Sequence, residues 1–233
     1  MFKILISIVL FTFALNASTA EALKAFKAGD YNNAFKLYKE SADANNTKAQ
    51  NALSYLYFNG FGVDKDEEKG IYWLKKAASS DDARAQNDLG MMYLTGHNVA
   101  HDSKSAFKWL TKASSADNPN AQYNLALMYY RGDGTDENAT KAVELLELSA
   151  KQGNIEAQRN IGRVYMQLLR FEEAAIWLEK DAIRGDESAY YLLGEIYCNL
   201  EKFKEAKKWV NLSQERGNKD AQLLWMKYNL EKY

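Results

Sequence analysis

The chain repeats one pattern of apolar and polar positions. An alanine, followed by glutamine in five of the six copies, recurs in steps of 36, 36, 36, 32 and 32 residues. Apolar and small residues then follow at offsets that share one face of a helix, since one helical turn takes about 3.6 residues. Each copy is therefore predicted to begin with an amphipathic helix. The alanines are Ala49, Ala85, Ala121, Ala157, Ala189 and Ala221.

Each copy continues with a second predicted helix, which has a large apolar residue at one inward position and small residues after it. The difference between 36 and 32 residues falls between the two helices, where three copies have long glycine-containing connectors and two have short turns. The long connectors are 59–66 "NGFGVDKD", 95–102 "TGHNVAHD" and 131–138 "RGDGTDEN". The large apolar residues are Trp73, Trp109, Leu145, Trp177 and Trp209.

Repeats of this length indicate a stack of similar units around a continuous core. One more helix pair is predicted upstream of the first clear copy, and half a copy follows the last. We therefore expect an all-α fold, a right-handed α-solenoid of six helix-turn-helix pairs and a C-terminal capping helix, in a single domain over 21–233. The predicted units are 21–48, 49–84, 85–120, 121–156, 157–188, 189–220 and the cap 221–233.

Residues 1–20 are predicted to be a signal peptide. Lys3 precedes an apolar stretch of about a dozen residues, too short for the roughly 20 that cross a bilayer. The stretch ends in Ser18-Thr19-Ala20, small residues typical of a cleavage site. We expect cleavage near Ala20 rather than a retained anchor, so the mature protein would be periplasmic or secreted in a bacterium, without stable membrane insertion.

Composition narrows the classes of partner. Without Lys3, 29 basic side chains face 31 acidic ones, and this balance argues against nucleic acid, which requires an excess of positive charge. The single cysteine, Cys198, cannot close an internal disulfide. One proline and 47% hydrophobic residues favour a helical globular chain over a disordered one.

The stretch 85–114, "AQNDLGMMYLTGHNVAHDSKSAFKWLTKAS", resembles the Sel-one-like repeat, a relative of the tetratricopeptide repeat. The resemblance covers about 49–230 well and 21–48 loosely, and the two short copies are closer to tetratricopeptide units. It implies a scaffold for contacts with other proteins. The family mostly supplies such scaffolds, and we expect no catalytic, metal-binding or cofactor-binding residue here.

If the units resemble tetratricopeptide units, their first helices line a concave surface that binds a protein or peptide. Tyrosine, methionine and arginine, which are enriched where proteins recognise proteins, occur at the relevant positions. Three arginines among them favour a carboxylate-bearing ligand, although they could instead pair with local acids. The predicted partner-binding residues are Tyr55, Phe58, Met91, Tyr123, Leu127, Tyr130, Arg131, Arg159, Arg163, Met166, Tyr191 and Glu195.

Two short motifs suggest a metal site and a nucleophilic serine, and both have simpler explanations. His97 and His101 with Asp102 could ligate zinc, but Asp66 has the place of Asp102 in the preceding copy without histidines, which favours a solvated loop. Ser105 and Lys108 match S-x-x-K of penicillin-recognising enzymes, but neither S-D-N nor K-T-G accompanies them, which favours chance.

An alternative function comes from a subgroup of the resembling family. Cysteine-rich secreted members are described as penicillin-binding proteins or weak β-lactamases, and paired cysteines staple their helix pairs. The alternative is therefore a cell-envelope protein that binds or weakly hydrolyses β-lactams or peptidoglycan fragments. Here Cys198 stands alone, so this subgroup's hallmark is missing.

Two asparagines are candidate glycosylation sites. Asn45 and Asn138 each begin an N-x-Thr sequon with an aspartate two places earlier, Asp43 and Asp136. This resembles the extended acceptor of bacterial N-glycosylation. Ordinary helix capping is the competing explanation, since Thr140 or Asn138 could start the second helix.

Overall fold

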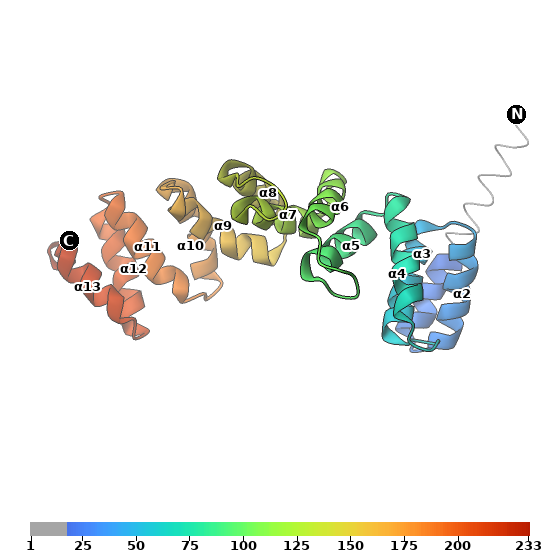
Figure 1. Ribbon diagram of the computed structural model, residues 1–233. Coiled ribbons are helices and arrows are strands. Elements are labelled where there is room, and N and C mark those ends of the chain that lie inside the picture. Colours follow the sequence, from blue (N-terminus) through green and yellow to red (C-terminus); the bar gives the residue numbers. More distant parts are fainter. Residues whose placement is uncertain (1–17) are drawn as a thin grey trace, which may run out of the picture. The chain divides into compact units, whose positions relative to one another are not determined.

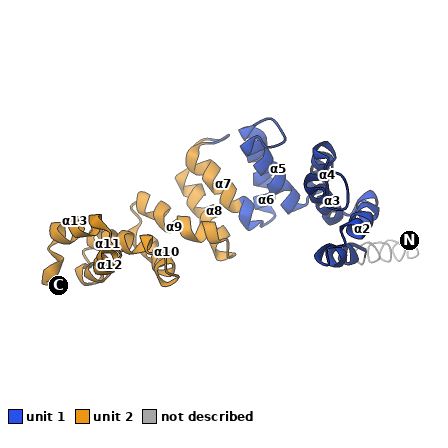
Figure 2. Cartoon of the chain, turned by 90° about the horizontal axis from the view of Figure 1, so that it is seen from below, with its two compact units in different colours: residues 1–121, 133–135 blue, residues 122–132, 136–233 orange. Residues whose placement is uncertain are grey.

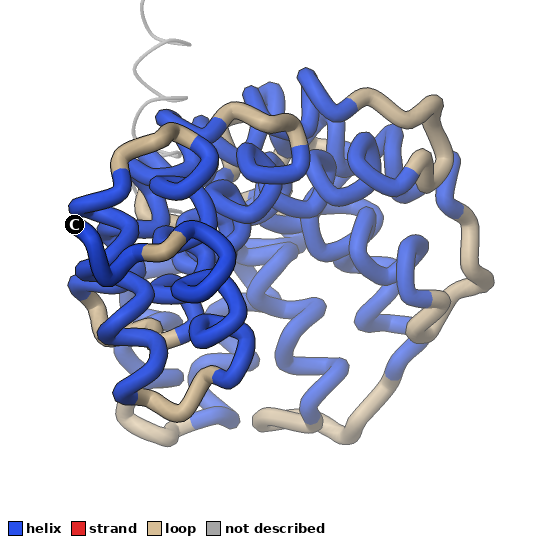
Figure 3. Tube along the Cα trace, turned by 90° about the vertical axis from the view of Figure 1, so that its left-hand side faces the viewer, coloured by secondary structure: helices blue, strands red, loops and turns tan. Residues whose placement is uncertain are grey.

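The computed structural model describes residues 18–233, so most of the predicted signal peptide, residues 1–20, lies outside the described residues. Within the described part, the chain consists of helices joined by loops and turns, without strands (Figure 3). The helices are a first helix over 18–27, α2 (Tyr31–Asp43), α3 (Thr47–Asn59), α4 (Glu67–Ser79), α5 (Ala83–Thr95), α6 (Ser103–Ser115), α7 (Pro119–Arg131), α8 (Ala139–Lys151), α9 (Ile155–Gln167), α10 (Phe171–Ile183), α11 (Ser188–Asn199), α12 (Phe203–Glu215), α13 (Lys219–Tyr228) and the short 3-10 helix η1 (Leu230–Lys232) (Figure 1).

Consecutive helices pack against one another. The two helices of a pair are in contact in α3–α4, α5–α6, α9–α10 and α11–α12, and the second helix of a pair contacts the first helix of the next in α4–α5, α8–α9 and α10–α11. α13 closes the series against α11 and α12. The predicted all-α solenoid of stacked helix pairs is confirmed.

The chain forms two compact units (Figure 2). Unit 1 comprises Met1–Ala121 together with Asp133–Thr135, and unit 2 comprises Gln122–Gly132 together with Asp136–Tyr233. Each unit has buried apolar clusters of its own. We describe the two units separately, and the single domain over 21–233 stays a prediction.

The small residue in the first helix of each copy allows a close approach of the second helix. In unit 2, a Cβ added at Gly162 would lie 2.7 Å from Cγ of Leu178, and one at Gly194 would lie 2.6 Å from Cγ2 of Val210. In unit 1, Gly90 faces Leu110 in the same way. Interiors packed this closely do not admit an extra methyl group without displacement, so the repeated glycine is a packing requirement.

The repeated Ala-Gln pair connects one helix pair to the next. Gln50 donates its side-chain N–H to the carbonyl of Ala42 at 3.2 Å, and Gln86 donates to Ala78 at 3.1 Å. In unit 2, Gln158 donates to Ala150 at 2.8 Å. Each acceptor lies in the last turn of the preceding helix, where carbonyls have no partner within the helix. Each of these carbonyls also accepts a backbone N–H from the turn after its helix, so the glutamine adds a second hydrogen bond that ties the helix end to the next copy, while its alanine packs in the core.

The long connectors end in residues that cap the second helices. The side chains of Asp66, Asp102 and Asn138 accept hydrogen bonds from backbone N–H groups in the first turns of α4, α6 and α8. Gly62 shows why these connectors contain glycine, because it has φ +69° and an added Cβ would overlap the backbone of Tyr31. The connectors are therefore structural parts of the repeat.

None of the helices within residues 18–233 has the length and apolar character needed to cross a membrane.

Candidate functional site

Every predicted partner-binding residue is exposed or half-buried in the structure. Tyr55, Phe58 and Met91 belong to unit 1, and the other residues of the predicted set belong to unit 2. The structure does not place the whole set in one described site, and the role of these residues in binding stays a prediction.

In unit 1, Tyr55 belongs to a group of aromatic rings in which Tyr55 and Tyr31 are exposed and Phe26 and Phe61 are half-buried against the core. Its ring centroid lies 6.1 Å from that of Phe26 and 6.0 Å from that of Phe61, and Tyr31 stacks on Phe61 at 4.7 Å. Phe58 has a packing role, because its ring lies against Gly70 of α4 and leaves no space for a Cβ there.

In unit 2, two predicted tyrosines connect α7 to α9. The hydroxyl of Tyr123 accepts a hydrogen bond from Nδ2 of Asn160 at 3.2 Å. The hydroxyl of Tyr130 donates to the side-chain oxygen of Gln167. Burial raises the pKa of Tyr123, and the nearby Glu156 adds to this effect. Both rings are held at the half-buried surface, where they can support a bound chain.

The structure separates the predicted arginines by role. Arg159 is exposed on α9, with 58% of its side chain accessible, and pairs with Glu156 at 3.2 Å. Arg163 is fixed between elements, because it donates to the carbonyl of Arg159 at 2.9 Å and to Oγ of Ser188 at 2.7 Å. Arg131 is exposed at the end of α7. Arg159 and Arg131 are therefore the exposed arginines of the predicted set, while Arg163 is held by contacts within unit 2.

Asp181 is a functional candidate that our sequence reasoning missed. It lies in the last turn of α10, and its side chain is only 2% exposed. Nη1 of Arg184 is 3.4 Å from Oδ1, while Oδ2 is buried and has no hydrogen-bond partner within the described residues. Burial raises the pKa of Asp181, and the charge of Arg184 opposes that shift. An unpaired buried carboxylate oxygen is costly, so it requires an explanation.

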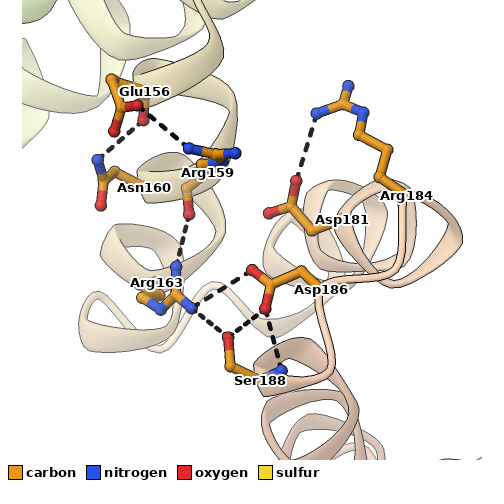
Figure 4. Close-up of polar contacts among 8 residues, drawn as sticks. All are labelled: Glu156, Arg159, Asn160, Arg163, Asp181, Arg184, Asp186 and Ser188. Carbon is orange, nitrogen blue, oxygen red and sulfur yellow. Dashed lines mark hydrogen bonds and ion pairs between the residues drawn. The ribbon is translucent and has the colours of Figure 1, made fainter.

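A cavity of about 750 Å³ adjoins this carboxylate. Figure 4 shows Asp181 and Asp186 pointing toward α9, which carries Arg159 and Arg163. Two arginines and two acids line the cavity, Arg159, Arg184, Asp181 and Asp186, and they pair with one another or with the neighbouring Arg163 and Glu156. The residues that line the cavity are Ile155, Gln158, Arg159, Asp181, Arg184, Gly185 and Asp186.

A signal in the sequence could have identified Asp181. Counting from the large apolar residue of each second helix, the same position is alanine or serine in every other helix pair. The equivalent residues are Ser41, Ala77, Ala113, Ser149 and Ser213. The aspartate is thus a departure from the repeat at a buried position, and such departures mark candidate functional sites.

The other candidate residues have structural roles. Oγ of Ser105 donates to Oδ2 of Asp102 at 2.6 Å, so both residues belong to the N-cap of α6. Nε2 of His101 lies 3.4 Å from Oγ of Ser103. Cys198 is 2% exposed, and burial raises its pKa to about 11, in agreement with a packing role. Residues 18–233 contain no group of three or more side chains suited to hold a metal ion.

The two candidate glycosylation sites differ in their surroundings. Asn45 is exposed, in a turn with φ +64°. Asn138 is the N-cap of α8, and its side chain accepts the N–H of Lys141 at 3.0 Å. The capping explanation therefore holds for Asn138, and modification of either residue stays a prediction.

Comparison with known families identifies the repeat. The sequence pattern of the Sel1 repeat matches residues 25–46, 47–82, 83–118, 119–154 and 187–210, more than half of the chain. The pattern does not match 155–186, the stretch that contains Arg159, Asp181 and Arg184. No curated protein matches the chain significantly.

Solved structures show the same fold. A protective antigen present in uropathogenic Escherichia coli strains, with an SLR fold, is 26% identical to this chain, with a TM-score of 0.75. The match covers 91% of this chain and 49% of the antigen, so this chain spans about half of the antigen's length. A Sel1 repeat protein from Oxalobacter formigenes is 29% identical, with a TM-score of 0.67, over 87% of this chain and 88% of that one. PilF of Pseudomonas aeruginosa shares only the fold, at 16% identity and a TM-score of 0.58, over 94% of this chain and 98% of that one.

Proposed function

The chain belongs to the Sel1 repeat family, and from this premise we propose that it binds a protein or peptide partner through exposed first-helix residues of unit 2. Scaffolds built from Sel1 repeats are typical of protein–protein interaction. Tyr123, Tyr130, Met166 and Tyr191 supply half-buried apolar surface on α7, α9 and α11. Such residues are enriched in protein interfaces.

The observation that carries the proposal is the exposed Arg159 beside a cavity. Its partner Glu156 is 57% exposed, and an ion pair this close to water contributes only about 0–1 kcal/mol. A carboxylate of the partner can therefore displace Glu156 at little cost and accept two parallel hydrogen bonds from the guanidinium group. We propose a carboxylate-bearing protein or peptide as the ligand.

Capture of partners from a cell-envelope extract tests the proposal. Arg159→Glu should abolish capture, since it places a negative charge where the ligand's carboxylate would bind. Arg216→Glu is the matched control, because Arg216 is also an exposed arginine of unit 2 paired with an acid, at 3.1 Å from Glu187. Circular dichroism should show equal helical content in both variants. Capture that survives Arg159→Glu unchanged would refute the proposed interface.

We also propose that the protein is exported after cleavage near Ala20. Ser18 and Thr19 lie in the first described helix, and the hydroxyl of Ser41 donates to that of Ser18 at 3.2 Å, so cleavage would remove this contact. The mass of the native protein tests export directly, since a chain that begins at Glu21 is expected. The same mass spectrum reports any glycan on Asn45 or Asn138.

The alternative, an envelope protein that binds or hydrolyses β-lactams, stays a prediction. The hydroxyl of Ser105 donates to Asp102 in the N-cap of α6, and this accounts for the serine structurally. Turnover of a chromogenic cephalosporin that Ser105→Ala abolishes would establish the alternative, and no turnover above buffer is expected.

A further inference from the structure

The buried carboxylate of Asp181 and the exposed guanidinium of Arg159 border the same cavity. We propose that this cavity binds a terminal basic residue, with its free carboxylate on Arg159 and its cationic side chain on Asp181. The proposal rests on the proposed function and deepens it, because it states which end of a partner the site would recognise.

The first argument comes from the unpaired oxygen. An ionised carboxylate only accepts hydrogen bonds, so the group that hydrogen-bonds to Oδ2 of Asp181 must be a donor. A cationic donor is favoured, since a charge buried in the protein requires a partner of opposite sign. Arg184 does not fill this role, because it contacts the other oxygen at 3.4 Å and keeps 47% of its side chain exposed. The terminal torsion of an aspartate is broad, so Oδ2 can turn toward a donor that enters the cavity.

The second argument comes from the charge balance around the cavity. Arg159, Arg163 and Arg184 are each within ion-pair distance of an acid, Glu156, Asp186 and Asp181 respectively. The site therefore has no excess of positive charge that would select a simple anion. A ligand with one negative and one positive group matches this arrangement and leaves the balance unchanged.

The third argument comes from the wall of the cavity. Ile155 lines it and is 58% exposed, so it presents apolar surface to the cavity. The aliphatic stem of lysine or arginine can cover this apolar surface while its charged end reaches a carboxylate. A cavity of about 750 Å³ lies within the common range for ligand sites, roughly 300–1,000 Å³. A lysine or arginine with a free carboxylate satisfies all three features.

Fluorescence anisotropy with short labelled peptides tests the proposal in the full mature chain. The peptides share one sequence and end in lysine, in norleucine, which has the same stem without the charge, or in lysine amide, which lacks the carboxylate. The wild-type protein should prefer lysine to norleucine, and the free acid to the amide, each by about tenfold, the order of one charge-assisted contact.

Two variants taken from the other repeats assign each preference to one residue. Asp181→Ala installs the residue of Ala77 and Ala113, and it should remove the preference for lysine but keep that for the free acid. Arg159→Tyr installs the residue found at the equivalent positions Tyr123 and Tyr191. It should remove the preference for the free acid but keep the preference for lysine. Because each variant keeps one preference, loss of folding cannot produce this pattern. A competition experiment distinguishes a free amino acid from a peptide end as the ligand. If free L-lysine displaces the labelled peptide as effectively as unlabelled peptide does, the ligand is the amino acid; if it competes weakly, the ligand is the end of a peptide.

The outcomes distinguish this inference from the proposed function. Equal binding of the lysine and norleucine peptides, binding of none of them, or a preference for lysine that survives Asp181→Ala would overturn the inference. In those cases, the capture experiment still tests the proposed function separately. The proposed function is supported if Arg159→Glu abolishes partner capture and Asp181→Ala does not.

Discussion

Asp181→Ala is expected to make the protein more stable, although it removes a charged side chain and an ion pair. The change converts the last turn of α10 to the residue found at the same place in α4 and α6, so the helix tolerates it. A gain in stability from deleting a residue that is needed for binding is typical of functional sites, where unfavourable groups are retained for their activity.

The magnitude follows from the surroundings of the carboxylate. Oδ2 is buried without a partner within residues 18–233, and such a group costs about 1–3 kcal/mol. A negative charge in the last turn of a helix adds about 0.3–1 kcal/mol to that cost. The pair with Arg184 offsets only about 0–1 kcal/mol, since its length is 3.4 Å and the arginine is half exposed. Taken at their midpoints, these terms give the variant a gain of about 2 kcal/mol in its free energy of unfolding.

The gain should depend on pH in a definite direction. Burial raises the pKa of Asp181 in the folded protein, so the folded state binds this proton more tightly than the unfolded chain does. The cost of the buried charge is fully present above the folded pKa and disappears as the pH falls through it toward the unfolded pKa. The advantage of Asp181→Ala should therefore be largest at neutral pH and shrink in acid.

Urea unfolding followed by circular dichroism at neutral and mildly acidic pH measures both effects. Ser213→Ala is the control, because its hydroxyl, at the equivalent position, is also buried without a partner among residues 18–233 but carries no charge. Its effect should not change with pH. An Asp181→Ala protein that is less stable than the wild type, or whose advantage is the same at both pH values, would refute the reasoning.

Three further predictions concern the repeat itself. Gly62→Ala and Gly29→Ala both place an alanine at positive φ, at a cost of about 1–2 kcal/mol, but only Gly62→Ala also overlaps the backbone of Tyr31. Gly62→Ala should therefore lose at least about 1 kcal/mol more in urea unfolding, and equal losses would contradict the close approach. Asn138→Ala should cost about 1 kcal/mol by removing the N-cap of α8, whereas Asn138→Asp, which restores the residue of Asp66 and Asp102, should cost nothing in the same assay. The Cys198 thiol, buried and with its pKa raised to about 11, should resist alkylation at pH 8 until the protein unfolds, and rapid labelling of the native chain would show that it is accessible.

Much of the fold can be inferred from the sequence because the same packing contacts recur in successive copies of the repeat. Most helix pairs have a small residue where the two helices cross and a glutamine that donates a hydrogen bond to the end of the previous helix, and each long connector ends in a side-chain cap. These are local or nearest-neighbour requirements, so they appear in the sequence at constant spacing. Departures from the spacing, such as the short turns after α9 and α11, were visible for the same reason.

The candidate site was predictable only in outline. The sequence alone determined that Arg159 and Arg163 share a surface-facing side of one helix, but it assigned them the same role. Only the tertiary structure decided that Arg163 is bound to Ser188 of α11 while Arg159 stays exposed. It also placed Asp181 beside the cavity, with Oδ2 unpaired among the described residues. Whether this oxygen finds a partner depends on side chains from α9, from α10 and from the turn after α10, which only the folded chain brings together. A periodic pattern describes which face of a helix is buried, whereas the partner of a buried charge is set by distances that only the packed chain defines.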